Sequence, residues 1–408
     1  MTVVSHHSIN FLIRSFYHDF CCIDVSKDKH DCYILSQDGQ VLVKPFSVPN
    51  SIAGFNVLFA AFTSFESNCA KVKVGLEATA HYTFNILGCR LDKDFPCYVF
   101  NPLHTNLYRK SLTLRKTKTD KVDSKIIAKM LLSEVDFKPC SKALYHNEQL
   151  KSLSRYRFSK IRERANLKQQ LARLVNILFP ELEKLVSSLH LSAVYSLLEE
   201  LPGASFVAKA HLTRLTNLLS SNSHGRYKKV KALEIRNAAI SSVGCIIPAK
   251  SLELKHTIQL IRVLSEEIEE IDLQIKEIMA KINSPITSIP GLGINTSAMI
   301  LSEVGDFTKF DSPDKILAFA GVSPSTYQSG KLDNAYAHME KRGSRYLRYA
   351  LYNAATYVCK WDKTFALYLQ KKLSEGKHYF VAISHAIKKL VRVIYHLQLT
   401  GDTYKVAA

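Results

Sequence analysis

A stripe of apolar residues between Ser251 and Ile282 constrains the fold of this chain more than any other feature. Its members are separated by 4, 3, 3, 4, 3, 4, 3 and 4 residues, which is the spacing of a coiled-coil seam with one stammer. The seam predicts a long helix paired with another helix, within the chain or in a second subunit. An ordinary amphipathic helix packed on its own chain is the alternative. The members are Leu254, Ile258, Ile261, Leu264, Ile268, Ile271, Ile275, Ile278 and Ile282.

Short strands are predicted in the N-terminal part of the chain. The run "CCIDV" is apolar, and "HDCYILSQDGQVLVKPFSV" alternates on both sides of Asp38-Gly39, which indicates a hairpin. Two further strands are predicted at "KVKVGLEAT" and "CYVFNP", with helical patterns between them. A hairpin followed by strands that alternate with helices indicates an α/β domain over residues 17–145.

The rest of the chain reads as almost entirely helical. Residues 146–285 contain the seam and an earlier basic helix, "LKSLSRYRFSKIRERANLKQQLARLVNIL". Pro285 and Pro290 mark a boundary, beyond which residues 286–400 form a third, mainly helical domain with a loop-rich middle. The predicted fold class is therefore α/β plus α, with a helical coiled-coil region in the middle.

The charge of the chain points to a polyanionic partner. Its 408 residues include 55 Lys and Arg against 36 Asp and Glu, a formal net charge of +19. Nucleic acid is the expected partner, and a basic surface kept for solubility is the alternative. A hydrophobic content of 47% excludes a disordered chain. No apolar run is long enough to span a membrane, so no membrane association is expected.

Four carboxylates stand where predicted strands and a following helix meet. Asp24 lies inside an apolar strand, where a charge is costly unless it is paired or bound to metal. Glu77 ends a strand, and ligands gather at the carboxyl ends of strands in open α/β sheets. Asp120 and Asp123 are one helical turn apart. Such oxygen ligands suit Mg²⁺ or Mn²⁺, and two ions of this kind can clamp a phosphate.

Each acid also has a plainer interpretation. Asp120 can cap the helix, Asp123 can be a first-turn acid, Asp24 can begin a turn, and Glu77 can be a surface charge. Cations around the two aspartates favour the metal-site hypothesis, because they can hold a nucleic-acid backbone beside the acids. These cations are Arg115, Lys116, Lys118, Lys121 and Lys125.

The motifs "IDVSK" at 23–27, "GLEAT" at 75–79 and "KTKTDKVDSKIIA" at 116–128 resemble those of the DEDD transposases of bacterial insertion sequences. That family includes Piv-type DNA invertases and recombinases guided by a bridge RNA. The resemblance continues at "IPGLGINTSAMILSEVGDFTKF", "AFAGVSPSTYQSGK" and "KRGSRYLRYALYNAA", so it covers most of the chain in order.

This resemblance implies a RuvC-like, ribonuclease-H-type first domain whose catalytic and metal-binding acids are Asp24, Glu77, Asp120 and Asp123. It also implies a serine nucleophile at Ser329, although the family often has Ser-Ser-Gly-Gly where this chain has "QSGK". A bridge RNA and a DNA substrate are the implied partners, and the coiled-coil region predicts a homo-oligomer, dimeric or tetrameric. The implied location is the bacterial cytoplasm, at the nucleoid.

The third domain offers further candidate contacts with nucleic acid. The segment "SIPGLGINTSAMIL" fits a helix-hairpin-helix pattern, in which Gly291 and Gly293 let the backbone approach a phosphate. A plain helical turn is the alternative. The segment "MEKRGSRYLRYALYNAA" predicts a helix with a basic face opposite a core-facing one. The basic candidates are Lys341, Arg342, Arg345 and Arg348.

Four functions remain open at this point. A metal-dependent transposase or recombinase guided by RNA accounts for most of the motifs, and a Piv-like site-specific DNA invertase shares them. A junction-cutting nuclease would use the carboxylates alone and keep its activity without Ser329. A non-catalytic nucleic-acid-binding protein would tolerate loss of Asp24 and Asp123.

Overall fold

The computed structural model describes residues 19–66, 68–77, 82–91, 95–112, 120–133, 144–323, 328–329, 332–333 and 339–405. The chain divides into two compact units, Met1–His146 and Asn147–Ala408. Each unit has its own hydrophobic core, and they are described separately below.

The N-terminal unit is built on a five-stranded sheet in the order β3-β2-β1-β4-β5. The hairpin around Asp38-Gly39 is confirmed, because β2 and β3 pair in antiparallel register on either side of it. β1 is antiparallel to β2 and parallel to β4, and β4 is parallel to β5. The strands are β1 (Asp19–Val25), β2 (Lys29–Leu35), β3 (Val41–Pro49), β4 (Val72–Glu77) and β5 (Cys97–Phe100).

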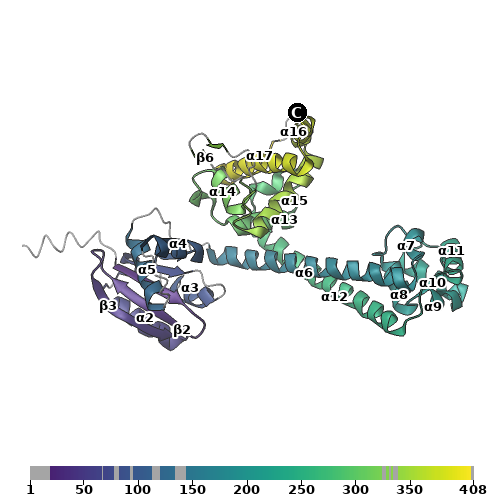
Figure 1. The fold of residues 1–408 in the computed structure, drawn as a ribbon, viewed down its shortest axis with the longest axis horizontal. Coiled ribbons are helices and arrows are strands. Elements are labelled where there is room, and N and C mark those ends of the chain that lie inside the picture. The colour runs from purple at the N-terminus through teal and green to yellow at the C-terminus, as the bar shows by residue number, and fades with distance from the viewer. Residues whose placement is uncertain are drawn as a thin grey trace, which may run out of the picture. The chain divides into compact units, whose positions relative to one another are not determined.

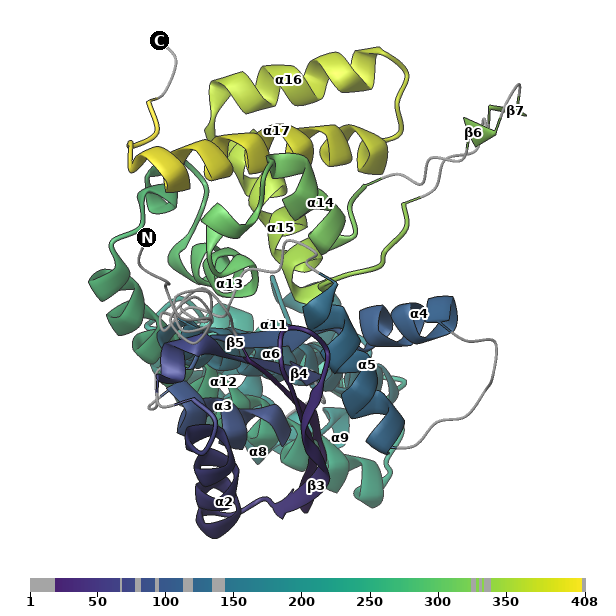
Figure 2. The same ribbon diagram turned by 90° about the vertical axis from the view of Figure 1, so that its left-hand side faces the viewer.

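Helices cover both faces of this sheet (Figure 2). α2 (Ile52–Thr63) and α3 (Thr83–Leu91) pack on one face, and η2 (Cys69–Lys71) leads into β4. α4 (Pro102–Leu112) and α5 (Asp120–Leu132) lie on the other. The α/β prediction for this part of the chain is therefore correct.

Two helices of 35 residues each dominate the second unit and lie side by side in Figure 1, namely α6 (Leu144–Leu178) and α12 (Pro248–Ile282). They run antiparallel. Arg164 Nη1 lies 3.1 Å from Ser265 Oγ, and Gln170 Nε2 lies 2.9 Å from Glu253 Oε1. Lys160 Nζ lies 2.7 Å from a carboxylate oxygen of Glu267. The partner of the seam helix is thus a helix of the same chain.

The predicted seam is the buried stripe of α12 as far as Ile275. At the helix end the prediction is only partly right, because Ile278 is half-buried against the C-terminal core and Met279 is buried, while Ile282 is 46% exposed. Met279 belongs to the C-terminal core, so packing against that core, and not the heptad count, decides which side chain is buried in the last turn.

A lobe of short helices lies at the far end of the long pair (Figure 1). Its core joins residues from both long helices, such as Leu171 and Ile258, to Leu198, Leu215 and Ile235 of the short ones. The short helices are α7 (Leu182–Leu185), α8 (Ser192–Glu200), α9 (Ala204–Lys209), α10 (Leu212–Asn222) and α11 (Lys229–Ile240).

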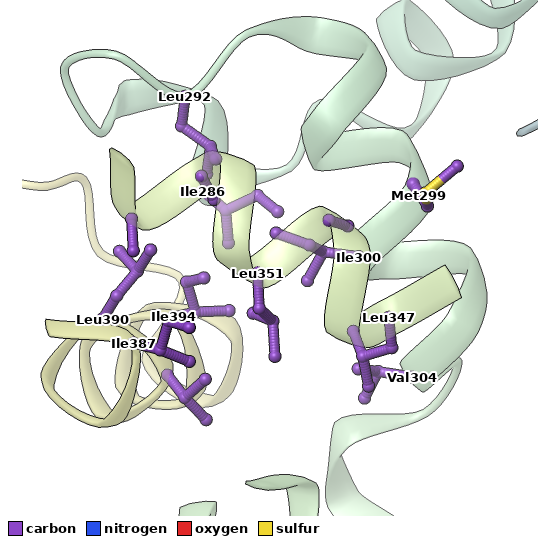
Figure 3. Packing of buried hydrophobic residues seen from close by; sticks show 14 of the residues in the cluster. Ile286, Leu292, Met299, Ile300, Val304, Leu347, Leu351, Ile387, Leu390 and Ile394 are labelled. Atoms are coloured by element: carbon purple, nitrogen blue, oxygen red, sulfur yellow. The ribbon is translucent and has the colours of Figure 1, made fainter. Parts of the chain in front are cut away.

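The near end of the pair packs into the C-terminal core, which Figure 3 shows from close by. Ile300 and Leu351 meet there with Ile387, and Leu150 and Ile275 bring both long helices into the same cluster. The C-terminal elements are η4 (Pro285–Ser288), α13 (Ile294–Val304), η5 (Phe307–Lys309), α14 (Pro313–Ala320), β6 (Gln328–Ser329), β7 (Leu332–Asp333), α15 (Arg345–Trp361), α16 (Lys363–Ser374) and α17 (Tyr379–Thr400). Among the helices described, none is long and apolar enough to cross a membrane.

Candidate active site

Two of the predicted acids, Asp24 and Glu77, lie at matching positions in two neighbouring strands. β1 and β4 are parallel, and their register pairs Ile23 with Leu76, so Asp24 and Glu77 come next. Side chains alternate between the faces of a strand. Asp24 therefore faces the same side as Cys22, which is the side that α5 covers. Glu77 faces that side too, at the carboxyl end of β4.

α5 comes close to the sheet at Gly75. A Cβ atom on Gly75 would lie 2.5 Å from Cδ1 of Leu131 and 2.9 Å from Cγ2 of Ile127. A side chain at this position would force Leu131 and Ile127 to shift, so glycine favours the depth at which the helix sits. Asp123 stands four residues before Ile127, on the same side of α5. The close approach at Gly75 thus brings Asp123 to the edge of the sheet where Glu77 ends.

Glu77 and Asp123 line one pocket of about 360 Å³. α4 supplies the polar side chains between them. The Thr105 hydroxyl donates to Glu77 Oε1, and Arg109 Nη1 lies 3.3 Å from Asp123 Oδ1. Arg109 Nη2 also donates to Asn106 Oδ1 at 2.7 Å. The two acids therefore have partners in α4, and the arginine balances the charge of Asp123.

Sequence reasoning missed Thr105, Asn106 and Arg109. The signal was present, since α4 begins at Pro102, directly after β5 ends at Phe100. A helix in that position starts at the same edge of the sheet as Glu77, because β4 and β5 are parallel and pair Glu77 with Phe100. Polar residues in its first turns were therefore candidates for the site.

The oxygen donors suit a hard cation in kind. Among the side chains that the structure describes, however, no three His, Cys, Asp or Glu residues are grouped closely enough to hold a metal ion. Asp24 is not among the residues that line the pocket. Asp120 begins α5, and its side chain lies outside the described part of the chain.

The predicted basic residues near the acids are only partly described. Lys125 projects from α5 into solvent, with Nζ 5.9 Å from the centre of the Tyr33 ring. Lys121 lies in α5, but its side chain is not described. Arg115, Lys116 and Lys118 lie outside the described residues.

Ser329 lies in β6, where its backbone pairs with Leu332 of β7. Figure 2 shows this small hairpin projecting from the helices of the C-terminal core. The described residues on either side of the segment are tied together, because the Ser344 N–H donates to the Phe319 carbonyl at 2.9 Å. A Cβ atom on Gly343 would lie 2.1 Å from that carbonyl oxygen, so the close approach requires glycine.

An ion pair with a buried carboxylate holds the end at Ser344. Glu303 of α13 has a side chain only 1% exposed and receives Arg155 of α6 through Nε at 2.5 Å and Nη2 at 3.0 Å. The hydrogen bond between Arg155 and Glu303 raises the pKa of the Arg155 guanidinium above its ordinary value. The Ser344 hydroxyl donates to the same carboxylate at 2.6 Å and accepts from the Leu347 N–H at 3.1 Å, so it also caps α15.

The predicted basic face of this region needs correction. Lys341 was expected on the helix with Arg345 and Arg348, but α15 begins only at Arg345, and Lys341 has a φ of +52°. Arg348 Nη1 donates to the carbonyls of Ala320 and Lys341, at 2.9 and 3.2 Å, so it connects backbone segments. Lys341, Arg342 and Arg345 are exposed.

The two glycines of the predicted hairpin differ in their surroundings. Gly291 has a φ of +86°, and a Cβ atom there would lie 2.7 Å from the Tyr357 carbonyl oxygen, so this glycine lets the turn pack on α15. Gly293 is exposed and precedes α13, with nothing within 4 Å of its Cβ position. One short 3₁₀ helix, η4, precedes the turn that contains Gly291.

Two protein-family models match the chain, one over the region of the predicted acids and one over the region of Ser329. A model described as a transposase, of the DEDD type of IS110, matches residues 21–180. A second model, described as the transposase family IS116/IS110/IS902, matches residues 283–370. Together they cover more than half of the chain. The chain belongs to the IS110-type DEDD transposases.

Relatives of this transposase-family chain come from several bacteria. The pilin gene-inverting protein of Moraxella bovis is 23% identical over 381 residues, which cover 91% of this chain and 93% of that protein. An uncharacterized 42 kDa protein of insertion element IS900 from Mycobacterium paratuberculosis is 23% identical over 91% of this chain and 94% of its own. An uncharacterized 43.6 kDa protein of IS110 from Streptomyces coelicolor is 26% identical, and the match spans only 56% of that relative's length.

Proposed function

We propose that this protein is the transposase of an insertion element and that it cuts and rejoins DNA with two sets of groups. One set is the carboxylates of Asp24, Glu77, Asp120 and Asp123. The other is the hydroxyl of Ser329. The observation that carries the proposal is the pocket in which Glu77 and Asp123 meet at the carboxyl edge of a five-stranded sheet. The strand order, with β1 between β2 and β4, supports a RuvC-like, ribonuclease-H-type domain.

The four acids would hold Mg²⁺ or Mn²⁺, which supplies positive charge to a phosphate as negative charge builds up on its oxygens. The donor set supports this role by its chemistry, although the described acids are not grouped as ligands. Asp123 is paired with Arg109 and Glu77 with Thr105, and these partners orient the carboxylates toward the pocket. Arg109 would also be available to a phosphate oxygen.

Ser329 would act as the nucleophile. Its Oγ attacks the phosphorus of a DNA phosphodiester, a new Oγ–P bond forms, and the bond from phosphorus to the leaving deoxyribose oxygen breaks. The Oγ proton leaves to a base, and the departing oxygen gains a proton. The strand end stays joined to Ser329 until a second hydroxyl displaces the serine. A structured bridge RNA would choose the sites by base pairing, in place of direct reading of bases by the protein.

The chemistry is tested by incubating the protein with DNA that carries the ends of its element, in the presence of Mg²⁺. A denaturing gel should show a protein–DNA adduct that Ser329→Ala abolishes and Ser329→Cys retains in part. Asp123→Ala should abolish strand cleavage as well. Cleavage that persists in Ser329→Ala would instead identify a nuclease that uses only the carboxylates.

A site-specific invertase is the second candidate, because the pilin gene-inverting protein of Moraxella bovis matches 91% of the chain. The two candidates separate when the protein is expressed with its native flanking DNA and the RNA that copurifies is sequenced. One discrete RNA encoded beside the gene supports RNA-guided transposition. Heterogeneous RNA, or none, together with inversion of a flanked segment, supports the invertase.

A further inference from the structure

We propose that a basic pocket on α17 binds the phosphodiester backbone of a nucleic acid. The choice of nucleic acid as the ligand rests on the proposed function. The pocket has a volume of about 740 Å³ and lies between α17, Tyr368 of α16 and the tail that follows Gly401. It is separate from the residues proposed above for catalysis and for contacts with nucleic acid.

The two sides of α17 have opposite characters. Ile387, Leu390 and Ile394 point into the C-terminal core (Figure 3). The pocket side repeats basic residues at intervals of three and four, which places them along one face of the helix. These residues are His385, Lys388, Lys389, Arg392 and His396.

Two of these cations are only weakly engaged within the protein. Lys388 Nζ and Arg392 Nη2 each lie 3.9 Å from Asp314 Oδ1, and their side chains are 52% and 57% exposed. Ion pairs this long and this exposed to solvent contribute little to stability. Both side chains are therefore available to a ligand at little cost to the fold.

The tail forms the second wall of the pocket and is anchored. α17 ends at Gly401, which has a φ of +76° and turns the chain back. The Tyr404 hydroxyl donates to Asp362 at 3.0 Å, and the Tyr404 N–H donates to Ser288 Oγ at 2.8 Å. Burial and the hydrogen bond to Asp362 raise the pKa of Tyr404 to about 12, so the phenol remains a hydrogen-bond donor. Lys405 then lines the pocket opposite the helix.

The lining favours a backbone over a base. Lys388, Lys389, Arg392 and Lys405 are set against a single carboxylate, that of Asp402. The aromatic side chains are already engaged, because Lys389 Nζ lies 5.0 Å from the centre of the Tyr368 ring and Tyr404 is bonded to Asp362. Phosphate contacts of this kind position a nucleic acid and carry no sequence information.

The test measures binding of a DNA duplex of arbitrary sequence, and separately of an RNA hairpin, by fluorescence anisotropy over a range of salt concentrations. The full chain is used with Ser329→Ala and without divalent cations, so that neither the serine nor a metal-dependent carboxylate site cleaves the probe. Lys388→Gln/Arg392→Gln should reduce affinity about tenfold at low salt and make the salt dependence of log K shallower by about 1.8 for duplex DNA, because two phosphate contacts are lost. The probe that responds identifies the strand held in the pocket.

Lys228→Gln/Lys229→Gln is the matched control, since it removes the same charge from exposed residues at the start of α11. An equal loss in the control, or no loss for either probe in the α17 variant, overturns the proposal. If the α17 variant melts early, acetylation of the unmodified protein gives the answer, because nucleic acid should protect Lys388 but not Lys228. Catalysis is absent from these measurements, so a failed recombination assay would leave their result intact.

Discussion

At the scale of single residues, Glu303 shows how a buried charge far along the chain sets the start of a helix. Its carboxylate is shared between Arg155 of α6 and the Ser344 hydroxyl that caps α15. The segment that contains Ser329 returns to the core just before Ser344, because Met339 already packs there, and the Ser344 N–H then donates to the Phe319 carbonyl on the other side of that segment. The geometry of that return therefore depends on an ion pair between residues 148 positions apart.

Glu303→Gln should destabilise the second unit by about 1–3 kcal/mol, because the amide keeps the shape but leaves the Arg155 charge without its ionic partner. Urea unfolding of the variant and of the parent protein measures this difference in the free energy of unfolding. Glu277→Gln, on an exposed face of α12, is the control and should change little. We also expect strand cleavage by Glu303→Gln to fall more than its DNA binding. Equal stabilities of Glu303→Gln and the control would show that the ion pair contributes nothing.

His30 makes the N-terminal unit sensitive to acid. The imidazole is fully buried in β2 and stacks on Phe55, with ring centroids 5.7 Å apart. Burial lowers the pKa of His30, and Asn50 and Asp31 offset only part of that shift. The folded state thus prefers the neutral ring, whereas the unfolded chain takes up a proton near its ordinary pKa of about 6.5. The neutral buried ring therefore makes its full contribution to the free energy of unfolding above about pH 6.5, and this contribution is lost as the pH falls through that value.

Lowering the pH from about 7.5 to about 5.5 should therefore reduce the free energy of unfolding by roughly 1 kcal/mol through this residue. His30→Leu, which cannot take up the proton, should lose less over the same interval. The measurement is urea unfolding of both proteins at the two pH values, followed by a signal from the N-terminal unit. The same pH slope in both proteins would rule out His30 as the source.

At the scale of helices and strands, regular patterns were predictable and long-range contacts were not. The period of the seam correctly predicted burial from Leu254 to Ile275, and the alternation around Gly39 correctly predicted the β2–β3 hairpin. Arg109 was missed because its partner, Asp123, belongs to the next helix. Lys341 was placed wrongly because the start of α15 is set by Ser344, whose partners lie in α13 and α14.

The last turn of α12 gives a direct test of this distinction. Hydrophobicity and heptad spacing favour Ile282, whereas the structure buries Met279 and leaves Ile282 46% exposed. Met279→Ala should cost about 2–4 kcal/mol of unfolding free energy, because it opens a cavity in the C-terminal core. Ile282→Ala should stay within about 0.5 kcal/mol of the parent protein. Thermal or urea unfolding that ranks them in the opposite order would contradict the packing described for this turn.

At the scale of the whole molecule, the proposed catalytic groups are divided between the two compact units. The acids belong to Met1–His146, and Ser329 belongs to Asn147–Ala408. The proposed site would therefore need one unit of each kind, taken from one subunit or from two. A homo-oligomer can form sites shared between subunits, because every subunit carries both the acids and Ser329. We predict that the acids of one subunit work with Ser329 of another.

Mixing Asp123→Ala with Ser329→Ala subunits tests this prediction. If sites are shared in a dimer, each mixed dimer has one site with both defects and one with none, so a random mixture should regain about one quarter of the parent activity. If each subunit completes its own site, every site carries one defect and nothing returns. Mixing Asp123→Ala with Glu77→Ala is the control, because both defects lie in the acid half and no arrangement of subunits gives an intact site. Activity in the first mixture and none in the second would establish sharing, whereas silence in both would place the acids and Ser329 of each site in one chain.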